Sequence, residues 1–199
     1  MAPTTGNGKI IGDVEHEARA IGVIGLGAMG MGVACSLKAA GLDVVGCDLS
    51  EQARAEFEAV GGRCVATPQV LGEQCDVVLV VVVNATQVEA VLFEPASGQA
   101  QGGADTAMGS LVDRLGPGAL VIQCATVAPA FAEALGQRLA QVGVDMLDAP
   151  ISGGAAKASR GELSVMASGR PQAFAKAEPA LAAMAATVHR LGDVPGPGS

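Results

Sequence analysis

Residues 20–40 read AIGVIGLGAMGMGVACSLKAA, and this stretch decides the fold. A short apolar run over residues 20–24 is followed directly by the pattern G-x-G-x-x-G and then by an alanine-rich, helix-favouring run. Strand, glycine turn and helix in this order predict a dinucleotide-binding βα unit. The three glycines of the pattern are Gly25, Gly27 and Gly30.

Each glycine of the pattern has its own expected role. Gly25 permits a tight turn, Gly27 lets a pyrophosphate approach the main chain, and Gly30 lets the helix pack close to the strand. The N-terminus of the helix then faces the phosphates. In the alternative interpretation the glycines serve helix packing alone and the methionine of the turn packs in the core. The residues predicted to hold the pyrophosphate are Gly25, Leu26, Gly27, Ala28, Met29 and Gly30.

An acidic residue, Asp48, ends the next predicted strand. It lies about 20 positions after the glycine turn, where a carboxylate that binds ribose hydroxyls is expected. Leu49 and Ser50 follow it, so no adjacent Arg is present to receive a 2′-phosphate. The sequence therefore predicts NAD as the cofactor rather than NADP. The alternative is that Asp48 is a solvated turn residue or a partner of a helix cap at Ser50.

Apolar segments and helix-favouring segments alternate along the chain. This alternation predicts an α/β fold with a Rossmann-like, doubly wound, mostly parallel sheet and helices on both faces. We expect a flexible leader over residues 1–19, one NAD-binding domain over 20–199, and a surface loop at 97–109. The predicted strands are 20–24, 42–48, 63–65, 77–83, 119–124, 145–149, 162–167 and 187–191. The predicted helices are 28–40, 51–60, 68–73, 85–92, 106–115, 129–142 and 172–185.

A second glycine-rich stretch, DAPISGGAAKASRGELSVMASG, spans residues 148–169. Pro150 ends a strand, and the loop Ser152–Gly154 offers backbone N–H groups that can bind an anion. The alternative is a plain glycine-rich hairpin. Ligand sites in such sheets lie at the carboxyl ends of the strands, where we expect several candidate segments to meet. These are Gly25–Gly30, Asp48, Val83–Asn84, Thr126 and Ser152–Gly154.

Composition excludes several classes of partner. The net charge of -8 argues against nucleic acid and against an anionic membrane. The five cysteines are scattered without a C-x-x-C pair, so we expect no metal site and reduced thiols in a cytoplasmic protein. The most apolar run, residues 77–83, suits a buried strand and is too short for a membrane span. The leader has no apolar core typical of a secretory signal.

The pairing of GLGAMG at 25–30 with DAPISGG at 148–154 resembles the β-hydroxyacid dehydrogenases. This group contains 3-hydroxyisobutyrate dehydrogenase and its relatives, including 6-phosphogluconate dehydrogenase, and the similarity covers residues 21–199. The resemblance implies NAD-dependent oxidation of a hydroxyl in a small hydroxy acid, with hydride passing to the nicotinamide. Softer similarities, including Lys157 and the segment 195–199, favour L-threonate or a similar four-carbon sugar acid as the substrate. The alternative substrates in this family are 3-hydroxyisobutyrate and tartronate semialdehyde.

The resemblance also implies roles for individual residues. Val83 and Asn84 would line the cofactor cleft, and Thr126 would lie beside the nicotinamide and the substrate. Asn84 and Thr126 each have the alternative of capping the helix that follows. Lys157 is either a cation on the substrate side or a solvated loop residue. The residues that would bind the substrate carboxylate are Ser152, Gly153 and Gly154.

Two features of the resembling family are expected to lie outside the chain. Its general acid/base is a Lys that would come shortly beyond Ser199, and its helical C-terminal domain, which mediates association, would follow. We therefore assign no catalytic residue, since Lys157, His16 and His189 are not suited to replace that Lys. One hypothesis is that the chain is part of a dehydrogenase, which forms a homo-oligomer when the full-length chain is present. The other is that the chain is a module that binds NAD and does not catalyse a reaction.

Overall fold

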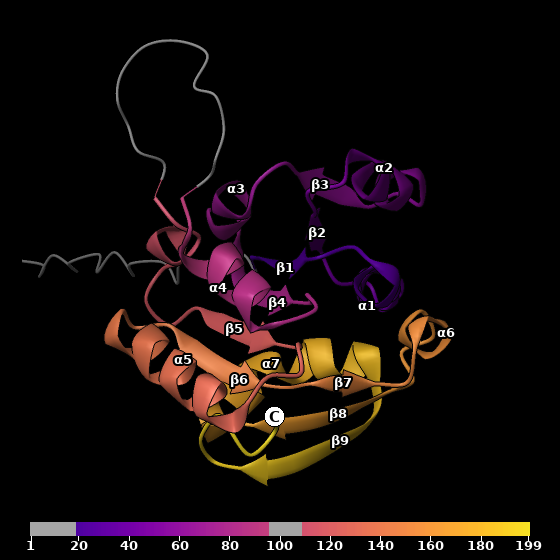
Figure 1. Cartoon of the computed structure of the whole chain (residues 1–199). Coiled ribbons are helices and arrows are strands. Elements are labelled where there is room, and N and C mark those ends of the chain that lie inside the picture. Colours follow the sequence, from indigo (N-terminus) through magenta and orange to yellow (C-terminus); the bar gives the residue numbers. More distant parts are fainter. Residues whose placement is uncertain (1–18, 96–108) are drawn as a thin grey trace, which may run out of the picture.

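The computed structural model describes residues 19–95 and 109–199. The expected leader at 1–19 and the expected surface loop at 97–109 thus lie outside the described residues, apart from Arg19 and Gly109. In the described residues nine strands form one mixed sheet that carries helices on both faces (Figure 1).

The first part of the chain alternates strictly between strands and helices. Thr67 and Pro68 begin one of these helices as predicted, because the Thr67 hydroxyl accepts a hydrogen bond from Val70 N and Pro occupies the first turn. The elements are β1 (Ala20–Ile24), α1 (Ala28–Ala39), β2 (Val44–Cys47), α2 (Glu51–Ala59), β3 (Arg63–Val65), α3 (Pro68–Gly72), β4 (Cys75–Val80) and α4 (Ala85–Phe93).

The second part contains shorter elements and an antiparallel strand pair. Its elements are the 3₁₀ helix η1 (Val112–Arg114), β5 (Leu120–Gln123), α5 (Pro129–Gln141), β6 (Asp145–Asp148), β7 (Ile151–Ser152), α6 (Ala155–Ala158), β8 (Leu163–Ser168), α7 (Pro171–Met184) and β9 (Ala185–Gly192). None of the helices in 19–95 and 109–199 is long and apolar enough to cross a lipid bilayer.

The sheet has the order β3-β2-β1-β4-β5-β6-β8-β7, and β9 pairs with β8. The six strands from β3 to β6 run parallel, whereas β8 runs antiparallel to β6 and β7. The strand order reverses between β1 and β4, so a crevice opens at the carboxyl ends of these strands. The Rossmann-like, doubly wound fold predicted from the sequence is confirmed.

Two apolar clusters fill the space between the sheet and its helices. On one face Leu37 of α1 and Phe174 of α7 belong to the same buried cluster. On the other face Leu71 of α3 and Leu139 of α5 belong to a second buried cluster. The α helices therefore divide between the two faces, as the alternating pattern requires (Figure 1).

The predicted helix 106–115 is wrong in its described part. Only the 3₁₀ turn Val112–Arg114 forms there. The Asp113 carboxylate accepts hydrogen bonds from Ser110 N at 2.7 Å and from Ser110 Oγ at 2.8 Å, which ties the segment into a local turn. Pro117 follows and prevents a regular helix from continuing.

The loop after β6 contains more regular structure than predicted. Ile151 pairs with Val165 of β8, which makes the strand β7, and the helix α6 follows the two glycines. The predicted strand 77–83 is β4, which begins earlier and ends at Val80. Val81–Val83 are therefore free to form a wall beyond the sheet.

Candidate functional site

A cavity of about 340 Å³ opens at the carboxyl ends of β1, β4 and β5. The glycine turn after β1 contributes Gly27–Gly30 to its wall, and the segment after β4 contributes Val81–Val83. Cys124–Thr126 after β5 and Ile151 of β7 complete the wall. Four segments that are far apart in the sequence thus meet at the crevice that the strand order creates.

Two glycines of the turn are required by packing. Gly25 has a φ of +92°, and a Cβ there would overlap the carbonyl oxygen of Val81. A Cβ at Gly30 would overlap the carbonyl oxygen of Gly25. A Cβ at Gly27, in contrast, would have no heavy atom within 4 Å. The turn is therefore packed tightly against its own backbone and against the segment after β4, and it is open at Gly27.

The start of α1 presents backbone donors to the cavity. Gly27 is the N-cap residue and makes no side-chain capping bond. The N–H groups of Ala28, Met29 and Gly30 belong to the first turn of the helix, so they have no intrahelical acceptor. Together with the helix dipole they form a surface that favours a phosphate or another anion.

Leu26 has a different position from the rest of the turn. Its side chain is buried in the apolar cluster, and its N–H donates to Asp48 Oδ2 at 2.6 Å. Leu26 therefore anchors the turn to the apolar core, and its N–H is already bonded to Asp48 and is not available to a ligand.

Asp48 connects the glycine turn to the loop after β2. Its second oxygen, Oδ1, accepts a hydrogen bond from Ser50 N at 2.7 Å, and Ser50 Oγ in turn caps α2 through Ala53 N. Asp48 is thus also a partner of the helix cap at Ser50, which was the alternative interpretation of this residue. A carboxylate has about four acceptor positions, so these two N–H bonds leave capacity for ribose hydroxyls.

Arg54 of α2 lies at the same loop and was not predicted from the sequence. Its Nη1 donates to the carbonyl oxygen of Asp48 at 2.5 Å and to that of Leu49 at 3.3 Å. The only sequence signal for this contact was an Arg in the first turns of the helix after Asp48. The guanidinium stabilises the loop after β2 by binding these two carbonyl oxygens.

Val83 and Asn84 have different positions at the end of β4. Val83 belongs to the cavity wall with 79% of its surface exposed. Asn84 Oδ1 accepts from Gln87 N at 2.9 Å, and Gln87 Oε1 accepts from Val83 N at 2.8 Å. The helix-capping alternative for Asn84 is confirmed, and Asn84 is not among the wall residues. The spacing N-x-x-Q was the sequence signal for this reciprocal cap.

Thr126 lies in the cavity wall and is exposed. The N-cap residue of α5 is Ala128, so the helix-capping alternative for Thr126 is wrong. Its neighbour Cys124 is buried, and this burial raises the pKa of the thiol to about 12, with a smaller contribution from Asp148. The thiol is therefore protonated at neutral pH.

The loop after β7 lies at the same edge of the sheet. Ile151 belongs to the cavity wall, whereas Ser152, Gly153 and Gly154 lie beyond it and are exposed. The φ angles of Gly153 and Gly154 are +140° and +81°, in the region that favours glycine. The structure thus brings this loop near the cavity without placing it in the wall.

Asp148 is a buried carboxylate that joins three strand ends to the C-terminal segment. It accepts hydrogen bonds from Gln123, Ser168, Gly196 N and Ser199 Oγ, the last at 2.7 Å. Burial raises the pKa of the Asp148 carboxyl, and the hydrogen bond from Ser199 opposes that shift. The sequence predicted Asp148 only as part of the strand 145–149, and its role as a hydrogen-bond acceptor was not predicted.

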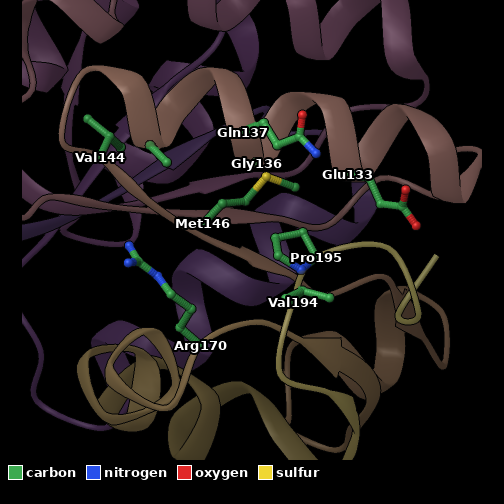
Figure 2. Close-up of a pocket in the computed structure, with 9 residues that line it drawn as sticks. Glu133, Gly136, Gln137, Val144, Met146, Arg170, Val194 and Pro195 are labelled. Carbon is green, nitrogen blue, oxygen red and sulfur yellow. The ribbon is translucent and has the colours of Figure 1, made fainter.

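A second cavity, of about 370 Å³, lies between α5 and the C-terminal segment. Figure 2 shows Gln137 and Glu133 of α5 on one side, Met146 of β6 beneath them, and Val194 and Pro195 opposite. Arg170, also in its wall, forms an ion pair with Asp145. None of the site residues predicted from the sequence lines this cavity, so we place the candidate site at the glycine turn.

Comparisons with known proteins show which family this chain resembles over most of its length. A family model described as the NAD binding domain of 6-phosphogluconate dehydrogenase matches residues 20–192. L-threonate dehydrogenase from Cupriavidus necator is 53% identical over 182 residues, which are 92% of this chain and 57% of that protein. L-threonate dehydrogenase from Escherichia coli K12 is 43% identical over 90% of this chain and 55% of that protein.

A solved structure extends the comparison to three dimensions. The structure of 3-hydroxyisobutyrate dehydrogenase from Salmonella typhimurium has a TM-score of 0.81 and 38% sequence identity. The match covers 91% of this chain and 59% of that protein. The chain thus spans little more than half the length of the relatives that it matches.

Proposed function

Because this chain belongs to the family of the NAD-binding domain of 6-phosphogluconate dehydrogenase, we propose that it forms the cofactor-binding part of an NAD-dependent dehydrogenase. We propose L-threonate, or a similar small hydroxy acid, as the substrate whose hydroxyl is oxidised. The observation that carries the proposal is the cavity at the carboxyl edge. It brings together the glycine turn, Val83 and Thr126 from three separate crossovers.

The residues of the cavity fit a dinucleotide. The N–H groups of Ala28, Met29 and Gly30 would bind the pyrophosphate, which can approach the chain at Gly27 because no side chain occupies that space. Asp48 would accept hydrogen bonds from the ribose hydroxyls. When bound, NAD would supply the hydride acceptor of the reaction.

Thr126 and the loop Ser152–Gly154 would orient the substrate. Thr126 is exposed and belongs to the wall, and its hydroxyl would bind a hydroxyl or carboxylate oxygen. The hydroxyl of Ser152 and the N–H groups of the two exposed glycines would bind the substrate carboxylate. Replacing Ser152 by Ala should weaken the binding of the hydroxy acid and leave NAD binding unchanged.

A second candidate function has a specific observation in its favour. Oxidation of a hydroxyl requires a base that removes its proton. The cavity wall offers Cys124 as its titratable side chain, and burial raises the pKa of that thiol to about 12. If no base is supplied from outside this wall, the chain would bind NAD without turnover.

The two candidates are separated by one assay. The protein from the complete gene is incubated with NAD and L-threonate, and NADH formation is followed by absorbance, with 3-hydroxyisobutyrate as a comparison substrate. Turnover supports the dehydrogenase. Saturable NAD binding without turnover on either acid supports the binding module, and no binding of NAD contradicts both.

The preference for NAD over NADP is tested at Asp48. Asp48→Ala should lower the affinity for NAD and reduce discrimination against NADP. Ser50→Ala is the matched control, because it removes the cap of α2 from the same loop and leaves the carboxylate in place. Equally tight binding of NAD and NADP, unchanged in Asp48→Ala, would contradict the assignment of NAD.

That the protein is cytoplasmic and that the full-length protein forms a homo-oligomer both remain predictions.

A further inference from the structure

The candidate site lacks a fixed positive charge at its wall. The wall residues are glycines, apolar side chains, Cys124 and Thr126, and none of them is charged. The protein as a whole carries a net charge of -8. A carboxylate that leaves water for such a site needs charged or strongly polar donors nearby. A cation next to the wall would therefore decide which ligands bind.

Lys157 lies directly on the loop Ser152–Gly154. Its N–H donates to the carbonyl oxygen of Gly154 at 3.1 Å, in the first turn of α6. A Cβ at Gly153 would lie 3.1 Å from Lys157 Cδ and 3.2 Å from Lys157 Cβ. The aliphatic part of the Lys157 side chain thus runs along the loop, on the side where Gly153 has no side chain.

The short helix that carries Lys157 is held against the helix of the glycine turn. Ala158 of α6 is fully buried. A Cβ at Gly32 of α1 would lie 2.7 Å from Ala158 Cβ and 2.8 Å from Ser159 N. Gly32 thus permits this close approach of α6 to α1. The loop and its lysine therefore have a fixed position relative to the turn that would bind the cofactor.

The charge of Lys157 is available to a ligand. In the residues that the structure describes, its ammonium forms no ion pair, whereas Arg160, three positions further on, pairs with Glu162 at 2.8 Å. Lys157 is also exposed. A lysine whose aliphatic chain is packed in place and whose ammonium group forms no ion pair can bind an anion without first breaking an ion pair.

We propose that Lys157 determines substrate specificity by binding the carboxylate of the hydroxy acid, together with Ser152 and the N–H groups of the loop. The inference rests on the proposed function and adds Lys157 as the residue that distinguishes substrates by their charge. Lys157 makes the site select anionic hydroxy acids over uncharged alcohols of the same size. It takes no part in binding NAD.

The test compares Lys157→Met with the wild type, using the protein from the complete gene and L-threonate as substrate. Lys157→Met removes a hydrogen bond from a charged donor, and the KM for L-threonate should rise roughly tenfold to hundredfold. The KM for NAD should not change, and Lys157→Arg should restore most of the affinity. Lys176→Met is the matched control, because Lys176 donates to the carbonyl oxygen of Gly118, outside the candidate site.

Each outcome has a separate meaning. A raised KM for L-threonate in Lys157→Met alone, with rescue by Arg, supports the inference. Turnover of L-threonate with the same KM in Lys157→Met and in the wild type would overturn it and leave the proposed function intact. A wild-type protein that oxidises no hydroxy acid would overturn the proposed function, and the inference with it.

Discussion

The two glycine-rich loops at the carboxyl edge of the sheet use glycine for different reasons. In the turn after β1, a side chain at Gly25 or Gly30 would overlap backbone oxygens. In the loop after β7, a Cβ at Gly154 would have no heavy atom within 4 Å, yet its φ is +81°. Packing demands glycine at Gly30, packing and backbone conformation both demand it at Gly25, and backbone conformation alone demands it at Gly154.

The difference indicates how much of each binding site the chain itself provides. The turn after β1 is enclosed by Val81 and by Leu26, whose N–H is held by Asp48, so it is formed before any ligand arrives. The loop Ser152–Gly154 is exposed and rests on α6. We therefore expect substitutions in the first loop to weaken NAD binding, and substitutions in the second to weaken substrate binding.

The largest effect is expected for Gly30→Ala. The new Cβ would overlap the carbonyl oxygen of Gly25, so the backbone of the turn must move. NAD affinity should fall by about 100-fold or more, which corresponds to about 3 kcal/mol. A fluorescence titration measures the affinity. Gly116→Ala is the control, because a Cβ there meets no heavy atom within 4 Å.

A smaller effect is expected for Gly27→Ala. The φ of Gly27 is -65°, which Ala adopts without strain, and the space around a Cβ is open. The melting temperature should therefore stay unchanged while NAD affinity falls about tenfold, because the methyl group occupies the path of the pyrophosphate. If the affinity were unchanged, the phosphates would have to lie elsewhere.

The smallest effect is expected for Gly154→Ala. Gly154 has a φ of 81° and a ψ of 168°, a region that is essentially restricted to glycine, and a side chain there costs about 1–3 kcal/mol. This strain should lower the melting temperature of a domain of this size by several degrees. NAD affinity should not change, because the loop lies outside the wall of the cofactor cavity. Calorimetry and the same titration measure both quantities. A clear loss of NAD affinity would mean that the two loops are not independent.

Local sequence signals predicted one side of this comparison well. The strand, the glycine turn and the start of α1 depend on residues that are neighbours in the chain, so periodicity and glycine spacing sufficed. The reciprocal cap of Asn84 and Gln87 is equally local. The helix expected at 106–115 does not form in its described residues, because the Ser110–Asp113 hydrogen bonds favour a turn over a regular helix.

Contacts between distant residues could not be predicted in this way. The strand β7 exists because Ile151 pairs with Val165 across the hairpin. The contact between Gly32 and Ala158 joins two helices that are far apart in the sequence. Such pairings depend on the assembled sheet, and the motif glycines alone carry no signal for them.

The most direct test of the central claim locates bound NAD on the protein. Amide chemical shifts of ¹⁵N-labelled protein are recorded while NAD is added. We predict shifts for Gly27–Gly30, Val83 and Thr126 around the carboxyl-edge cavity, with Gly136 and Val194 of the second cavity unaffected. Shifts centred on Gly136 and Val194, with the glycine turn unchanged, would contradict the account.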